Sequence, residues 1–504
     1  MCSIFQSFPL GPKQGHITVS EQGGEFVALP QDSAKVKIQG YPDVQISKES
    51  TRSLTQRENA KSAFLPHDET VSKRIYHAWQ DMGLPGALEE IINSSHDVPT
   101  WICSVSQKLL MLTRLTGSLH GSFFPHLSLS NEEIVSKYSS VQHWGSSPVK
   151  AFAWHPHTVK FALALQDDSI RVHSSASDLT PILKHKLQKN VASLAWQPNS
   201  SSVLAVACQS CVLIWHIEPT SLATRPSASS VQVLQRGGHC PVTMVHWSPD
   251  GRTLLSVSPV DASILAWAVA METCMPLWRY GGGGVSLVTW SPDGSKVFSA
   301  TPSNVFRVWE TRSWTCEKWY SVTGHVKAAC WSPEGNVVLF ATENQPIIYS
   351  LTFAAVSDES SPVIGGSQTA VACADLSETS IEMSDGKAIK VGGQIHQMVW
   401  DPQGGRLAVI LGESCEFVAV FRTQRSPMLE ITPCGLVRGQ DGERPEMVQF
   451  KPSFDGGSLL TVVWSSGRIG YIPLYYISSA GVNEMPQPPV INTHRFSNGL
   501  YSNT

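Results

Sequence analysis

Two short stretches of the chain carry residue types that could bind a metal or do catalytic chemistry. Cys208 and Cys211 stand at the spacing of zinc ligands and redox thiol pairs, and His155 and His157 could bind a metal or transfer protons. The cysteines lack a second Cys or His pair at zinc-site spacing, and the histidines lack a carboxylate or nucleophile at a recognisable spacing. We therefore interpret the cysteines as small buried apolar residues and the histidines as turn residues.

A glycine run at 281–284 has the composition of a phosphate-binding loop but lacks its continuation. Such a loop ends in Gly-Lys-Ser or Gly-Lys-Thr, which does not follow here. Ser and Asp residues recur in Ser-Pro-Asp-Gly turns, where they are expected to make local hydrogen bonds. The sequence therefore predicts no catalytic residue, no metal and no cofactor, and it favours a binding platform over an enzyme.

The elements that carry these residues repeat along the chain. Seven times an aromatic residue stands two positions before a proline, and 18 to 21 positions later another aromatic residue or a histidine closes a β-rich run. The openers are Trp154, Trp196, Trp247, Trp290, Trp331, Trp400 and Phe450. Their closing partners are His173, Trp215, Trp267, Trp309, Tyr349, Phe421 and Tyr471. Repeats of this length, each with several short strands, are typical of WD40-type β-propellers.

One repeat illustrates the expected strands, at 287–290, 296–300 and 305–309, with a Ser-Pro-Asp-Gly turn after the first. A single blade cannot bury its own faces, so neighbouring blades must stack and the ring must close. The sequence thus predicts an all-β fold, a seven-bladed WD40-type β-propeller over residues 144–476. We expect a strand from residues 9–45 to complete the last blade, with an additional degenerate blade there as the alternative.

Residues 66–143 break the β pattern and predict a helical module that precedes the propeller. Helices are expected over 71–82, 87–93 and 98–119, and a Ser130/Glu133 capping box begins a last helix that runs to about residue 141. The third helix has a wide apolar face that carries the candidate partner-binding residues Trp101, Leu109, Leu112 and Leu115. This face either packs on the propeller or docks another protein.

Three further segments lie outside the regular repeat. Residues 354–393 form an insertion, part of which should supply the outer strand of blade five and part a hairpin that turns at 384–386. Residues 1–65 form an N-terminal segment. Residues 477–504, rich in Pro, Asn and Ser, are expected to be a disordered tail.

The amino-acid composition argues against several classes of binding partner. The net charge is −4, from 37 basic and 41 acidic residues, so nothing attracts nucleic acid or anionic lipid over a long range. There is no apolar run of about 18 residues and no signal-peptide pattern, which predicts a chain that neither is secreted nor spans a membrane. Eleven scattered cysteines fit a reduced intracellular set. We expect protein partners, with no nucleic acid, no small-molecule substrate and no direct membrane insertion.

Several stretches resemble the aladin family of WD-repeat nucleoporins more closely than they resemble generic WD repeats. They include residues 120–129, 151–158 and, above all, 183–196, which reads LKHKLQKNVASLAW. The resemblance covers most of residues 65–475. It implies a non-catalytic scaffold or adaptor of the nuclear pore complex that supports nucleocytoplasmic protein transport. It also implies recruitment to the nuclear envelope by a transmembrane pore nucleoporin, and a role in mitotic spindle assembly around the spindle and centrosome.

An alternative function follows from one tetrapeptide. Trp309-Glu310-Thr311-Arg312 resembles the Trp-Asp-x-Arg ending with which some propellers engage the adaptor of a cullin-type ubiquitin ligase. This resemblance would make the chain a substrate receptor of such a ligase.

Overall fold

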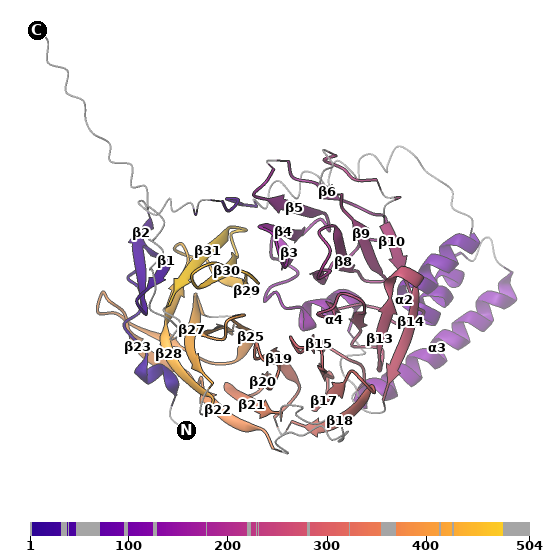
Figure 1. Cartoon of the computed structure of the whole chain (residues 1–504). Coiled ribbons are helices and arrows are strands. Elements are labelled where there is room, and N and C mark those ends of the chain that lie inside the picture. The colour runs from indigo at the N-terminus through magenta and orange to yellow at the C-terminus, as the bar shows by residue number, and fades with distance from the viewer. Residues whose placement is uncertain are drawn as a thin grey trace, which may run out of the picture.

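The chain forms a closed ring of seven β-sheet blades with helices attached on one side (Figure 1). The computed structural model describes residues 3–31, 38, 40–46, 71–94, 99–123 and 129–476, apart from gaps at 178, 219–222, 228, 230, 280–282, 322, 354–368, 413–414 and 426–427. This architecture confirms the predicted seven-bladed β-propeller with N-terminal helices.

Blades one to six are antiparallel four-stranded sheets, and their innermost strands contact one another around the ring. Blades one to three contain β3 (Val149–Trp154), β4 (Lys160–Leu165), β5 (Ile170–Ser174), β6 (Ile182–Leu183), β7 (Ser193–Trp196), β8 (Val203–Ala207), β9 (Val212–His216), β10 (Val231–Leu234), β11 (Met244–Trp247), β12 (Leu254–Val257), β13 (Ser263–Ala268) and β14 (Thr273–Trp278). Blades four to six contain β15 (Leu287–Trp290), β16 (Lys296–Ala300), β17 (Val305–Glu310), β18 (Thr315–Tyr320), β19 (Val326–Trp331), β20 (Val337–Thr342), β21 (Ile347–Thr352), β22 (Val371–Asp375), β25 (Ile395–Trp400), β26 (Arg406–Leu411), β27 (Phe417–Gln424) and β28 (Glu430–Arg438). A short 3₁₀ turn, η5 (Val269–Met271), joins β13 to β14.

Local chemistry explains both the strands and the turns between them. Strands such as β8 and β16 are buried along their whole length, which suits their apolar residues because stacked blades cover both faces. In the turn after β15, Ser291 Oγ accepts from the Lys296 N–H at 2.9 Å. Gly294 has φ +73°, a left-handed conformation that favours glycine. The Ser-Pro-Asp-Gly motif therefore builds the hairpin between β15 and β16.

The aromatic openers connect neighbouring blades. The Trp196 indole N–H donates to the Ala153 carbonyl at 3.1 Å, that of Trp247 to Ala195 at 3.2 Å, and that of Trp331 to Thr289 at 3.2 Å, each on the innermost strand of the preceding blade. Trp154 reaches Thr461 of blade seven at 2.9 Å, and Trp400 bonds Thr423 of its own blade. The Trp290 indole N–H has no hydrogen-bond partner among the described residues. Most openers therefore form a hydrogen bond between two neighbouring blades.

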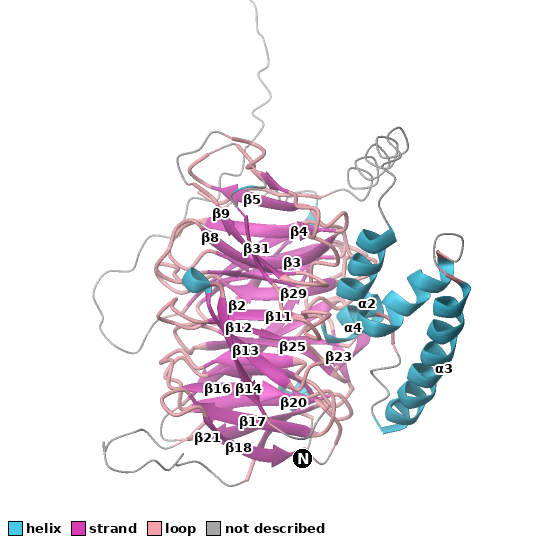
Figure 2. Cartoon of the chain, turned by 90° about the vertical axis from the view of Figure 1, so that its right-hand side faces the viewer, coloured by secondary structure: helices cyan, strands magenta, loops and turns pink. Residues whose placement is uncertain are grey.

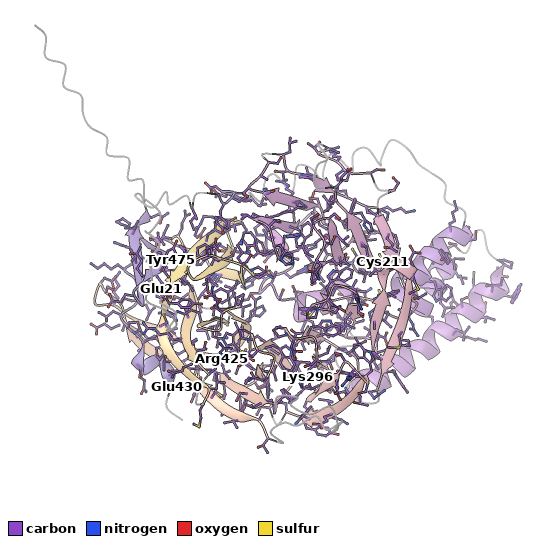
Figure 3. The ribbon with its side chains drawn as sticks, in the orientation of Figure 1. Glu21, Cys211, Lys296, Arg425, Glu430 and Tyr475 are labelled. Carbon is purple, nitrogen blue, oxygen red and sulfur yellow. The ribbon has the colours of Figure 1, made fainter. Side chains whose placement is uncertain are left out.

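An N-terminal hairpin closes the ring. Blade seven contains β29 (Pro445–Phe450), β30 (Ser458–Trp464) and β31 (Ile469–Tyr475), and the sheet continues with β1 (His16–Gln22) and β2 (Glu25–Pro30). Strand β1 runs parallel to β31, with Glu21 opposite Leu474, and Figure 3 shows Glu21 near Tyr475 at this seam. The 3₁₀ turn η1 (Ile4–Ser7) buries Phe5 against Phe421. Two strands and an aromatic anchor therefore come from the N-terminal segment.

The insertion after blade five contributes ordered structure. Strand β22 is the outer strand of blade five, and β23 (Thr379–Glu382) pairs with β24 (Ala388–Val391) in a hairpin. Met383, in the turn of this hairpin, forms a β-bridge with Gly11, so the hairpin packs on the N-terminal segment. Residues 354–368 of the insertion and the tail predicted for 477–504 lie outside the described residues.

Among the described residues, three α-helices precede blade one: α2 (Val71–Asn93), α3 (Thr100–Phe123) and α4 (Asn131–Tyr138). The capping box that begins α4 is present, with Ser130 and Glu133 bonded reciprocally. The predicted break at residues 83–86 is wrong, because α2 continues through Gly83 and Pro85. Helix α3 packs along α2, and such tertiary packing outweighs the local preference of Gly and Pro to end a helix.

Candidate functional site

The arrangement closest to a catalytic constellation lies inside blade three. His239 Nδ1 bonds Asp261 Oδ2 at 2.7 Å, and its Nε2 bonds Ser256 Oγ at 3.0 Å. Burial alone would raise the pKa of the Asp261 carboxyl, but hydrogen bonds from His239 and Ser263 outweigh it and hold that pKa below its ordinary value. The order Ser–His–Asp is that of a hydrolase triad.

Burial and bonding exclude nucleophilic chemistry at this network. Ser256 is fully buried, and its Oγ also accepts the indole N–H of Trp267 at 2.8 Å. A substrate cannot approach a hydroxyl that is enclosed on all sides, so the network instead fixes the blade. We did not predict it from the sequence, although Gly238-His239 and the closing Trp267 were the signals that could have located it.

The cysteine and histidine candidates are structural as well. Cys208 and Cys211 are buried in the turn between β8 and β9, where burial raises the pKa of the Cys208 thiol. His155 Nδ1 accepts from the backbone N–H groups of His157 and Thr158, so its Nε2 must carry the proton and donate to Ser200 at 3.0 Å. Within the described ranges, no cluster of three or more His, Cys, Asp or Glu residues could hold a metal ion.

Part of the glycine run has a steric purpose. Gly284 has φ +129°, and a side chain there would collide with the backbone of Pro259 in the preceding blade. The backbone therefore needs glycine for a close approach between blades rather than for a ligand. Residues 281 and 282 lie outside the described residues.

Helix α4 and the segment that follows it cover one mouth of the central channel, and we call residues 130–147 the plug (Figure 1). Lys327 Nζ of blade five donates to the Lys137 carbonyl at the end of α4 at 2.6 Å. His143 bonds Glu446 of blade seven at 3.1 Å, and the Trp144 indole N–H donates to Val191 at 2.9 Å. The chain itself therefore occupies this part of the ring's surface, and only the remainder is open to partners.

Acid is expected to destabilise the ring through the histidine that holds the plug. His396 lies beside Ser140, and burial, with the nearby charge of Lys327 as a smaller cause, lowers its pKa from 6.5 to about 3. The unfolded chain therefore binds this proton at a higher pH than the folded chain does, and stability falls as the pH drops below 6.5. Urea unfolding between pH 7 and 4 should show this loss, with a shallower slope for His396→Gln. Equal slopes for both proteins would contradict the assignment.

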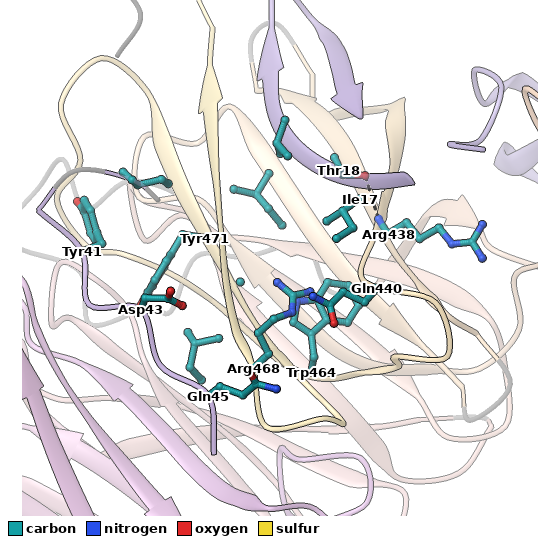
Figure 4. A pocket seen from close by; sticks show the side chains of 15 residues that line it. Ile17, Thr18, Tyr41, Asp43, Gln45, Arg438, Gln440, Trp464, Arg468 and Tyr471 are labelled. Atoms are coloured by element: carbon teal, nitrogen blue, oxygen red, sulfur yellow. Dashed lines mark hydrogen bonds between the residues drawn. The ribbon is translucent and has the colours of Figure 1, made fainter. Parts of the chain in front are cut away.

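A hollow of about 480 Å³ lies at the closing seam, between β1, residues 38 and 41–45, and blade seven (Figure 4). Its two arginines already have acidic partners. Arg468 Nη2 lies 2.6 Å from Glu443, and Arg438 Nη2 lies 3.3 Å from Asp441, while the Arg438 backbone N–H donates to Thr18. Because these cations are neutralised within the chain, the hollow belongs to ring closure and offers no free charge for an anionic ligand.

The candidate partner-binding helix lies outside the ring. Trp101 and Leu109 are exposed on α3, and Figure 2 shows α3 beyond α2, away from the blades. The side chains of Leu112 and Leu115 lie outside the described residues. Of the two alternatives for this face, packing on the propeller does not hold for Trp101 and Leu109, because both are open to solvent. Docking of another protein stays a prediction. None of the described helices is long and apolar enough to cross a bilayer.

The ligase-type tetrapeptide lies at the end of β17. Trp309 is buried and bonds Ser299, whereas Arg312 is exposed in the turn before β18. An exposed turn arginine is common whether or not a partner binds it. The substrate-receptor function stays a prediction.

The blades stack into a closed ring, and buried polar side chains form hydrogen bonds within and between them. This architecture is that of a seven-bladed WD-repeat propeller. Residues 130–475 match the family described as the Aladin seven-bladed propeller. The chain belongs to that family.

The chain is also similar to several individual proteins. The chain is 30% identical to Aladin of Arabidopsis thaliana over 358 residues, which is 66% of this chain and 76% of the relative. It is 28% identical to WD repeat and HMG-box DNA-binding protein 1 of Xenopus laevis over 138 residues, 26% of this chain and 12% of that protein. A chain of the solved Mitotic Checkpoint Complex aligns with a TM-score of 0.47 at 18% identity, covering 66% of this chain and 88% of the other.

Proposed function

We propose that the chain is a non-catalytic scaffold of the nuclear pore complex that supports nucleocytoplasmic protein transport. A transmembrane nucleoporin holds it at the nuclear envelope, and in mitosis it contributes to spindle assembly near the centrosome. The observation that carries this proposal is membership of the Aladin propeller family over residues 130–475, together with the sequence resemblance to nucleoporins of that family.

The physical properties of the ring support a scaffold. Indole hydrogen bonds join successive blades, so the surface keeps a fixed shape on which several proteins can bind at once. The buried polar groups that resemble catalytic ones, such as His239 and Ser256, are used inside the blade. Affinity for partners would then come from a few exposed aromatic or arginine side chains.

Imaging of the full-length chain in living cells tests this function. A fluorescently tagged chain is expected to form a punctate nuclear rim in interphase, because scaffold nucleoporins stay at the pores. A free fluorescent protein provides the control for diffuse signal. A tagged chain spread evenly through cytosol and nucleus, with its fold intact by circular dichroism, would contradict the proposal.

A further inference from the structure

Three cations lie at the outer edge of the ring where blades three and four meet, and we call Arg279, Arg307 and Lys318 the basic cluster. Arg307 on β17 stands directly opposite Lys318 on β18, the outermost strand of blade four. Arg279 follows β14, the outermost strand of blade three, and its guanidinium lies 5.2 Å from the centre of the Trp309 ring of blade four. The cluster therefore joins two successive blades, whose outer strands are labelled in Figure 1.

The alternation of side chains along β18 separates its lysine from its acidic residue. Cys316 and Lys318 share one face, and Cys316 packs in the hydrophobic cluster between blades three and four. Glu317 shares the opposite face with Trp319, whose ring stacks 5.9 Å from that of Phe306 in the hydrophobic cluster between blades four and five. Lys318 therefore faces blade three, and Glu317 faces away from the basic cluster.

The other acidic side chains of these strands and turns are directed elsewhere. Glu310 follows the alternation of β17 onto the face toward blade five. Glu272, in the turn before β14, accepts from the Gln232 amide of blade two at 3.0 Å. Asp261, in the turn before β13, bonds His239 at 2.7 Å. The basic cluster therefore faces basic and neutral side chains of the two blades.

The described contacts of Arg279 and Lys318 are with neutral groups. Arg279 donates to the backbone carbonyls of Trp278 at 2.7 Å and Trp314 at 3.3 Å. The Lys318 ammonium lies 4.6 Å from the centre of the Tyr320 ring. Carbonyls and aromatic rings stabilise a cation without cancelling its charge, so the cluster keeps its positive charge.

This gathering of like charges costs stability in the free chain. Like charges directly opposite each other on neighbouring strands are destabilising. Arg307 is only 5% exposed, and burial, with a smaller contribution from the Arg279 charge, lowers the pKa of its guanidinium. A single edge-strand lysine such as Lys318 protects against aggregation, but that purpose requires neither arginine. An anion bound among the three side chains would offset the repulsion.

Strand β18 also offers backbone groups that a polypeptide can use. It is the last strand of its sheet, so the N–H and C=O groups along its outer edge point away from β17. An extended peptide can pair with such an edge, and every second side chain of that peptide then points to one face. Strand β14 contains Pro276, which lacks a backbone N–H and makes that edge less suitable. Lipid headgroups and nucleic acids cannot form a strand ladder of this kind.

We propose that an extended peptide with carboxylate or phosphate side chains pairs with β18 and that the basic cluster binds its anionic groups. Arg279 and Lys318 are exposed, and an arginine guanidinium presents paired donors that match either anion. Figure 2 shows α2 and α3 on one face of the ring, so they leave this outer edge open. The interaction goes beyond the proposed function and does not depend on it.

Fluorescence anisotropy with the purified full-length chain tests the proposal. The probes are fluorescein-labelled peptides in which valine alternates with glutamate, with phosphoserine or with glutamine. The test variants are the double variant Arg279→Gln, Lys318→Gln and the single variant Lys318→Glu, which changes one exposed side chain. A matched control, Arg252→Gln, Lys387→Gln, removes two cations that are 87% and 67% exposed elsewhere on the ring. Circular dichroism verifies that each variant is folded.

We expect the chain and the control variant to bind at least one of the two anionic peptides, and added salt to weaken this binding. The glutamine peptide should bind about tenfold or more weakly, and both test variants should lose about tenfold or more of their affinity for the anionic peptide. The tighter of the two anionic peptides identifies the anion as carboxylate or phosphate. No binding of either anionic peptide, or unchanged affinity in the folded test variants, would overturn the proposal. Binding of a labelled single-stranded DNA, with both peptides unbound, would overturn it as well. None of these failures bears on the imaging test of the proposed function.

Discussion

Replacing Arg406 with methionine is expected to lower the free energy of unfolding by about 3–5 kcal/mol. Glu21 on β1 is fully buried, and its carboxylate accepts from Arg406 Nε at 2.9 Å and from a second guanidinium nitrogen. The Arg406 guanidinium also lies 4.4 Å from the centre of the Tyr476 ring. Without the arginine, an isolated carboxylate would remain buried at the seam that closes the ring. Urea unfolding of the purified chain measures the loss.

The double variant Glu21→Met, Arg406→Met provides the control for this prediction. It removes both charges and leaves apolar side chains of similar length, so it should recover most of the stability that the single variant loses. A single variant as stable as the parent would show that the pair does not hold the N-terminal hairpin in place. A double variant as unstable as the single one would assign the loss to packing rather than to unpaired charge.

Replacing Trp309 with alanine should cost about 3–5 kcal/mol, because a large buried side chain is lost and a cavity is left behind. Trp309 is 2% exposed and its indole N–H donates to Ser299 Oγ at 2.8 Å. Its ring packs in the cluster between blades three and four, where the Arg279 guanidinium lies 5.2 Å from the ring centre. The loss would therefore weaken contacts between two blades.

Trp101→Ala is the matched control, since this tryptophan is largely exposed on α3. Its effect should stay within about 0.5 kcal/mol, as for most surface substitutions. Thermal unfolding of both variants beside the parent separates the two outcomes. Equal melting temperatures for the parent and Trp309→Ala would show that our assignment of closing residues is wrong.

The blades could be predicted from sequence because their chemistry is local and repeated. An aromatic opener two residues before proline marks the end of each innermost strand, and the indoles of Trp196, Trp247 and Trp331 bond the preceding blade in the same way. Each single occurrence of this pattern is a weak signal, but seven occurrences at similar spacing identify the repeat. The strands around residues 287–309 accordingly match the expected ones to within one residue.

The contacts of the N-terminal segment could be predicted only in outline. Phe5 packs on Phe421, and β1 pairs with β31, across separations of more than 400 residues that leave no periodic trace in the sequence. Helix α2 passes through Gly83 and Pro85 because its neighbour α3 supplies contacts that local propensity ignores. Contacts between residues distant in sequence therefore determine both the position of the N-terminal segment and the continuity of α2.

The sequence predicted which residues make up the candidate site, but it did not predict which parts of the protein surround them. Apolar periodicity located Trp101 and Leu109 on one helix, yet only the structure shows that both face solvent. The position of the plug over the channel depends on partners such as Lys327 and Glu446, which come from blades distant in sequence. A sequence pattern indicates what a helix can bury, but it does not indicate which surface covers it.

The pairing of β1 with β31 also fixes when the protein can finish folding on the ribosome. Blade seven needs both β1 (His16–Gln22) and β31 (Ile469–Tyr475), so β1 must wait until the chain through β31 has been synthesised. A premature stop codon ahead of β31 would yield a chain with most of its blades but with open sheet edges at the gap. Such edges invite aggregation, and cellular quality control would remove these products even though most of their sequence is normal.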